Sequence, residues 1–88
     1  RVPEDVVQRV RHAMLDAVEE HLSSSDRRLE DRISYAWDID SLWYLRPDLM
    51  NAIAAISGET VARDCINAIT TQFQGYHPGG KPTRLIRQ

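Results

Sequence analysis

The chain has 88 residues, of which 42% are hydrophobic and 27% are charged. Because a typical domain needs about 100 to 150 residues, this length fits one soluble globular domain and excludes a second. The formal net charge of −2 argues against the broad basic face of a DNA-binding protein. A single core of this size is modest, so we expect a homo-oligomer, with a dimer favoured, or another protein partner.

The single cysteine, Cys65, excludes a disulfide within the chain, and no spacing of Cys and His is typical of a metal site. The apolar stretches are only a few residues long, and the first residues lack the order of a signal peptide. We therefore expect a cytoplasmic protein with no membrane segment, no metal ion and no cofactor.

Two helices are predicted in the first 40 residues. Pro3 and the acids after it are typical of a helix start, and apolar residues then recur at three- and four-residue steps to Leu22. A polar stretch at 23–26 is rich in N-cap residues. A second helix is expected to follow it and to carry Leu29, Ile33 and Ala36 or Trp37 inward.

The third predicted helix begins after Asp40 as its N-cap and contains Pro47. Proline at this position removes the hydrogen bond to the carbonyl of Trp43, so the alternatives are one kinked helix or two short abutting helices. Two features favour the kink: Arg46 would make a poor N-cap, and the apolar spacing is unbroken through Leu42, Leu45, Leu49, Ala52 or Ile53, and Ile56. Gly58 is expected to end this helix in a left-handed conformation.

The clearest periodicity predicts a last helix over 59–74, and no alternating run indicates a strand. Glycines and prolines then stop the helix. The sequence thus predicts an all-α, compact bundle of three to four helices with antiparallel neighbours, in which the last two helices pack best. We place one domain at 1–76 and an extended or flexible basic tail at 77–88.

An aromatic cluster is the first candidate site, because Tyr35, Trp37, Trp43 and Tyr44 lie within ten positions and Arg46 follows them. Successive helical residues point about 100° apart, so Trp43 and Tyr44 cannot both face one core. Aromatic residues accompanied by arginine are typical of interface anchors. The alternative is that these rings cap a small core around a helix joint.

The tail is the second candidate site. It carries Lys81, Arg84 and Arg87 without any acid, next to the apolar pair at 85–86. Residues 1–40 hold six basic and ten acidic side chains, whereas residues 41–88 hold five and three. The tail therefore suits an acidic partner or the acidic first helices of another copy better than it suits nucleic acid.

The acids Asp16, Glu19 and Glu20 form a patch near the end of the first helix, where the helix dipole and each other's charge disfavour them. Cations of the tail would relieve this mismatch, although a solvated acidic surface is the commoner explanation. Cys65 lies beside the apolar row of the last helix, which favours an inert thiol.

Motifs of catalysis and of DNA recognition are missing from the sequence. There is no glycine-rich phosphate loop, no Gly-x-Ser-x-Gly and no Cys-x-x-Cys. A helix-turn-helix centred on Gly58 would need apolar residues where the chain has Asp64 and Asn67. We expect a non-enzymatic, self-associating interaction module; the alternatives are a nucleic-acid-associated regulator that uses the tail and a helical sensor of a small ligand.

Overall fold

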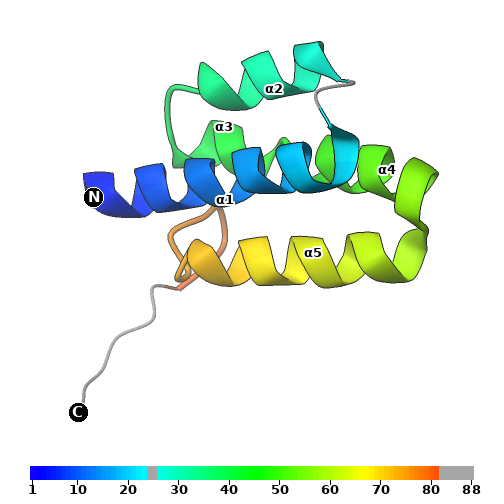
Figure 1. Cartoon of the computed structure of the whole chain (residues 1–88). Coiled ribbons are helices and arrows are strands. Elements are labelled where there is room, and N and C mark those ends of the chain that lie inside the picture. The colour runs from blue at the N-terminus through cyan, green and yellow to red at the C-terminus, as the bar shows by residue number, and fades with distance from the viewer. Residues whose placement is uncertain (24–25, 82–88) are drawn as a thin grey trace.

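The computed structural model describes residues 1–23 and 26–81, and this part of the chain contains helices and no strand (Figure 1). The helices are, in order, α1 (Glu4–Leu22), α2 (Arg27–Ser34), α3 (Ile39–Trp43), α4 (Arg46–Ser57) and α5 (Glu59–Gln72). The predicted all-α class is confirmed, as four helices of eight or more residues and the short α3.

Helix α1 lies at the centre of the bundle and contacts each of the other four helices. In the view of Figure 1, α2 runs back above α1, α5 lies below it, and α3 and α4 lie behind it. Helices α4 and α5 are antiparallel and share the most extensive contact in the molecule, as the sequence predicted. Gly58 joins them with a φ of 93° and a ψ of 163°. This conformation has the positive φ that favours glycine, but it is not the left-handed helical conformation that was expected.

The prediction of one Pro-kinked helix is wrong, because α3 and α4 are separate helices with Tyr44 and Leu45 between them. Pro47 lies in the first turn of α4, where a residue needs no hydrogen bond from its nitrogen. Leu45 remains near the right-handed helical conformation, with φ −88° and ψ −11°. The apolar residues therefore keep their helical spacing across a joint at which the backbone is not one continuous helix.

The start of α3 also differs from the prediction. Asp38, not Asp40, is the N-cap, and its carboxylate accepts a hydrogen bond of 2.9 Å from the backbone nitrogen of Ser41. Hydrogen bonding to Ser41 holds the pKa of Asp38 below its ordinary value. Asp40 lies in the first turn instead, where a carboxylate still favours the positive end of the helix dipole.

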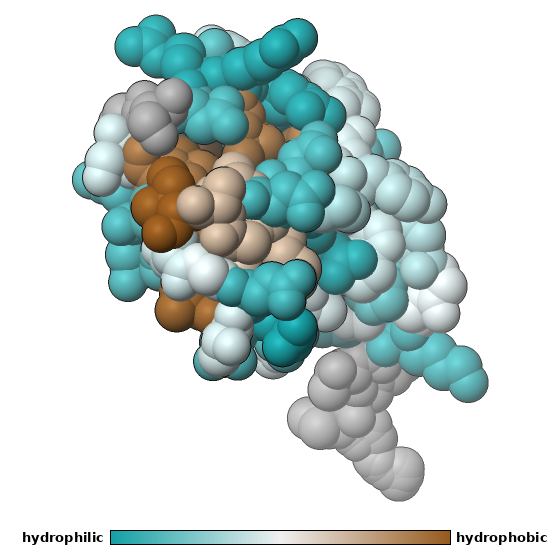
Figure 2. All heavy atoms as spheres, turned by 90° about the vertical axis from the view of Figure 1, so that its right-hand side faces the viewer, coloured by the Kyte–Doolittle hydropathy of each residue, from teal (hydrophilic) through white to brown (hydrophobic). Residues whose placement is uncertain are grey.

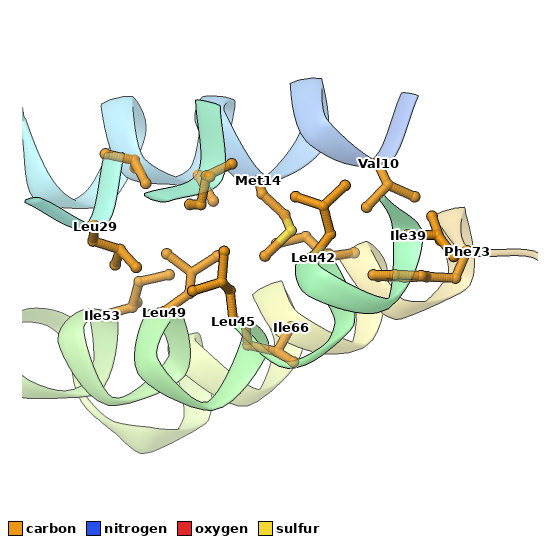
Figure 3. Packing of buried hydrophobic residues seen from close by; sticks show 14 of the residues in the cluster. Val10, Met14, Leu29, Ile39, Leu42, Leu45, Leu49, Ile53, Ile66 and Phe73 are labelled. Atoms are coloured by element: carbon orange, nitrogen blue, oxygen red, sulfur yellow. The ribbon is translucent and has the colours of Figure 1, made fainter. Parts of the chain in front are cut away.

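A single hydrophobic core fills the space between the helices, and Met14 reaches from α1 into its middle (Figure 3). Of the described residues, no polar or charged one is buried. The buried residues are Val6, Val7, Val10, Met14, Ala17, Val18, Leu22, Leu29, Ile33, Ile39, Leu42, Leu45, Leu49, Ile53, Ala62, Ile66, Ile69 and Phe73. Trp37 is not among them, so the expectation that Ala36 or Trp37 would follow Ile33 inward holds for Ala36 alone, which packs partly buried against the core.

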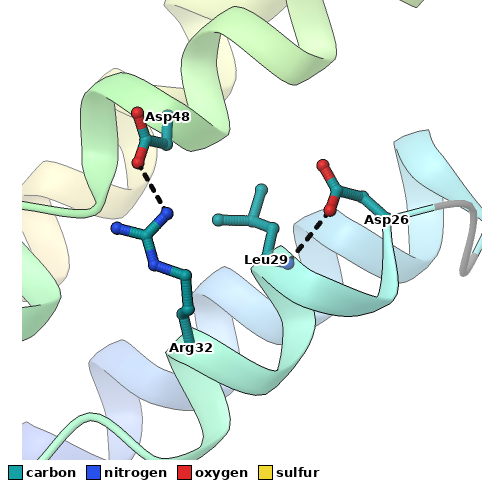
Figure 4. Close-up of polar contacts among 4 residues, drawn as sticks. All are labelled: Asp26, Leu29, Arg32 and Asp48. Carbon is teal, nitrogen blue, oxygen red and sulfur yellow. Dashed lines mark hydrogen bonds and ion pairs between the residues drawn. The ribbon is translucent and has the colours of Figure 1, made fainter.

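Polar contacts cap the start of α2 and fix its last turn to neighbouring helices (Figure 4). Asp26 accepts a hydrogen bond of 3.0 Å from the backbone nitrogen of Leu29, which caps the helix start. Arg32 lies 2.9 Å from Asp48 of α4. Just after Arg32, Nη1 of Arg11 donates to the carbonyls of Ile33, Ser34 and Ala36 at 2.9 to 3.1 Å. Arg11 thereby takes up carbonyls that the end of α2 would otherwise leave to water.

The start of the predicted tail folds back on the domain. The backbone nitrogen of His77 donates to the carbonyl of Gly75, and that of Gly80 donates to the carbonyl of His77, both at 2.9 Å. Residues 77 and 78 are partly buried. Turns with partly buried residues thus follow residue 76, and the predicted behaviour of residues 82–88 lies outside the described residues.

No helix in the described ranges has both the length and the apolar composition that crossing a membrane requires.

Candidate interaction site

The predicted aromatic cluster divides into two parts with different surroundings. Trp43 is partly buried against the core, whereas the exposed fractions are 81% for Tyr35, 90% for Trp37 and 66% for Tyr44. The expectation that Trp43 and Tyr44 face different surroundings is confirmed. We call Tyr35, Trp37 and Tyr44 the aromatic surface.

Trp43 belongs to a stack of rings at the end of α5. Its ring meets that of Phe73 edge-on, with centroids 5.1 Å apart, and lies parallel to that of His77 at 3.8 Å. The guanidinium carbon of Arg46 lies 3.3 Å from the centroid of the Trp43 ring, which is cation–π geometry. The side chains of Trp43 and Arg46 are thus both engaged in contacts within the chain. These contacts hold the side chains of Trp43 and Arg46 against the fold.

Arg46 is further fixed by two hydrogen bonds. Its Nε donates to the carbonyl of Trp43 at 3.2 Å, and its Nη1 donates to Oγ1 of Thr70 at 3.1 Å. Burial lowers the pKa of Arg46. Pro47 has no N–H to donate to the carbonyl of Trp43, and the hydrogen bond from Nε of Arg46 takes the place of that missing donor.

The aromatic surface borders an open hollow of about 510 Å³. Tyr35 and Tyr44 both line it, together with Arg32, Ala36, Ser41 and Leu45. Trp37 lies in the connection between α2 and α3, two residues after Tyr35. The only charged residue that lines the hollow, Arg32, is paired with Asp48. The hollow is therefore bounded by rings and carries little uncompensated charge.

A second exposed apolar area lies where α4 meets α5. The exposed fractions there are 62% for Ile56 and 42% for Val61. Figure 2 views the molecule from this end and shows hydrophobic side chains gathered within a largely hydrophilic surface. The sequence placed Ile56 in the apolar row of its helix but gave no sign that it would be exposed, because the row continues past the point where α1 covers it.

The basic tail contributes one described residue, Lys81, which is exposed. Arg84 and Arg87 lie outside the described residues. Among the residues that the structure does describe, no three His, Cys, Asp or Glu side chains are grouped in a way that would hold a metal ion. Arg11 is a structurally important side chain that the sequence analysis missed. Its position beside Val10 at the edge of the apolar row is the signal that could have identified it.

Comparison of the chain with models of known protein families, with curated proteins and with solved structures finds no match.

Proposed function

We propose that this chain is a small, non-enzymatic interaction module that associates with a second copy of itself through the aromatic surface. The observation that carries the proposal is the exposure of Tyr35, Trp37 and Tyr44, of which Tyr35 and Tyr44 line one hollow. Large exposed aromatic side chains are typical of protein interfaces, since they bury much area at a low cost in conformational entropy. We do not include Trp43 and Arg46 among the proposed anchors, because their side chains pack on each other and Trp43 also stacks on His77 within the chain.

The surface suits a second copy better than a charged partner. A two-fold interface places the same patch on both sides, so the patch has to be compatible with itself. An unbalanced charge would repel its own image, whereas Arg32 is already neutralised by Asp48 here. Each aromatic side chain offers about 150 to 250 Å². Since 66 to 90% of each is exposed, three of them supply roughly half of the area of about 800 Å² that each partner buries in an interface of standard size.

This association would not be needed to complete the core. The described core closes within one chain, with its largest side chains fully buried. The sequence argument for a partner, that the core is small, is therefore weaker than the argument from the exposed rings. We accordingly propose a reversible dimer of folded monomers. No specific observation favours the alternatives of a nucleic-acid regulator and a ligand sensor.

Sedimentation velocity of the full chain over a wide concentration range tests the proposal. We expect a concentration-dependent shift from monomer to dimer, and in the double variant Trp37→Ser/Tyr44→Ser we expect this shift to require a higher protein concentration. Both residues are mostly exposed, so this variant should keep its fold and unfold at a similar temperature.

The matched control is Ala55→Ser/Ile56→Ser, which removes exposed apolar surface from the far end of α4. It should still form the dimer. A wild-type chain that stays monomeric at the highest concentration would contradict the proposal. The same holds if the control loses the dimer and the aromatic variant keeps it.

A further inference from the structure

A groove runs between α1 and α5, on a part of the molecule that the aromatic surface does not include. Its volume is about 560 Å³. Ala17 and Ile69 are buried beneath it, and Cys65 is partly buried beside them. The groove therefore has a narrow apolar floor built from small and medium side chains of two helices.

Three exposed carboxylates line the same groove. Asp16 and Glu20 come from α1, and Asp64 comes from α5. None of the three forms an ion pair with another described residue, whereas acids elsewhere, such as Asp48, do. An apolar floor between acidic walls fits an extended segment that carries apolar side chains flanked by cations.

The C-terminal segment of this chain has that chemistry. Residues 84–87 read Arg, Leu, Ile, Arg, so an apolar pair stands between two cations, and Lys81 adds a third. The segment contains no acid. The charge of the tail thus complements the groove, and its two apolar side chains suit the floor.

The groove of the same molecule is poorly placed to receive this segment. His77 stacks on Trp43, and Arg46 reaches from beside Trp43 to Thr70. Helical residues are about 100° apart, so Thr70 lies on a different side of α5 from Cys65 and Ala68, which line the groove. The chain therefore leaves α5 on the side away from its own groove.

We propose that the groove between α1 and α5 binds the C-terminal segment, residues 81–88, of a second copy of this chain. This inference rests on the groove and its charges and does not depend on the aromatic surface. It would add a second contact between copies, in which the tail of one copy lies in the groove of another.

Cys65 provides the test, because it is the only cysteine and lines the groove. Alkylation of its thiol by a small maleimide is followed by mass spectrometry in the full chain. An occupied groove shields the thiol, so the alkylation rate of the wild type should fall as protein concentration rises. The tail variant Arg84→Gln/Arg87→Gln should be alkylated at the same rate at all concentrations. The assay is repeated with Trp37→Ser/Tyr44→Ser added, so that the aromatic surface plays no part.

A mixing experiment separates exchange between copies from docking within one. The tail variant keeps its groove, and a groove variant, Asp16→Asn/Asp64→Asn, keeps its tail; their masses distinguish them. Adding the groove variant should slow alkylation of the tail variant by about tenfold when it is present at about ten times the dissociation constant. Docking within one chain predicts no effect of mixing and a shielding that does not depend on concentration. Either result would overturn the proposal.

The control Asp31→Asn/Asp40→Asn removes the same charge from exposed carboxylates on α2 and α3. It should keep the shielding of Cys65. If it loses the concentration-dependent shielding, net charge and not the groove explains the effect, and the inference is wrong. Wild-type and tail variants that react alike at all concentrations would also refute it, whatever the sedimentation of the aromatic variant shows.

Discussion

The thiol of Cys65 is held in its neutral form by its surroundings. Partial burial raises its pKa, and the charge of Glu20 raises the pKa further. Glu20→Gln removes the second cause and leaves the first. We therefore expect the pKa of Cys65 to fall but to stay above its ordinary value, and alkylation at a fixed pH near 8 to become faster.

The pH profile of the alkylation rate in dilute protein measures this shift. Glu19→Gln is the matched control, since it makes the same change one residue away and Glu19 does not line the groove. Its profile should coincide with that of the wild type. An unchanged profile in Glu20→Gln would show that this carboxylate does not act on the thiol.

At the scale of single residues, the sequence predicted types of environment better than particular positions. It placed an acidic N-cap in the joint before the third predicted helix, but Asp38 and Asp40 both satisfy that pattern and only the backbone path decides between them. It required Trp43 and Tyr44 to point apart without saying which one faces inward. In the structure Trp43 faces inward, where its ring contacts those of Phe73 and His77, and local periodicity contains no trace of these contacts.

Arg11 holds the end of α2 against α1. Arg11→Met keeps most of the apolar stem and removes the donors to three carbonyls. Partly exposed carbonyls can turn to water, so we expect a loss of about 1 to 2 kcal/mol in the free energy of unfolding, measured by urea denaturation.

Arg9→Met is the control for this change. Arg9 lies 3.7 Å from Asp5 in an exposed pair on one helix, which is worth only about 0.3 to 0.5 kcal/mol. If both variants lose the same free energy of unfolding, the hydrogen bonds from Arg11 to the carbonyls at the end of α2 do not stabilise the fold.

Pro47 defines the start of α4. Its ring fixes φ at a value that the first turn of a helix needs, and no hydrogen bond is lost there. Pro47→Ala should therefore destabilise the fold by about 0.4 to 1 kcal/mol, because the unfolded chain gains freedom. Differential scanning calorimetry should show a melting temperature lower by a few degrees. A clear stabilisation would indicate that proline strains the joint between α3 and α4.

At the scale of helices, this joint shows where periodicity stops being informative. The spacing of Leu42, Leu45 and Leu49 correctly predicted three buried residues on one side. It also suggested a continuous helix, because Leu45 keeps a near-helical conformation while the hydrogen bonding changes around it. Side-chain spacing reports the direction of Cβ atoms, and a short break with near-helical angles leaves that direction unchanged.

At the scale of the whole molecule, the two proposed contacts differ in their physical origin. The aromatic surface associates by burial of rings, whereas the tail and the groove associate by charge. Screening acts over about 10 Å at 0.1 M salt and about 3 Å at 1 M. We expect the concentration-dependent shielding of Cys65 to weaken severalfold between these salt concentrations. The tail variant should still form a dimer in sedimentation at 1 M salt, since burial of apolar area does not weaken with salt.

Comparing the salt dependence of two variants tests each contact by itself. The tail variant retains only the aromatic contact, and Trp37→Ser/Tyr44→Ser retains only the tail contact. Salt should dissociate the second variant and spare the first. If salt dissociates both equally, the association through the aromatic surface is also electrostatic, and the paired charges of Arg32 and Asp48 at the hollow are the groups to replace next. If salt affects neither, the acidic groove does not bind the tail, because exposed ion pairs cannot escape screening.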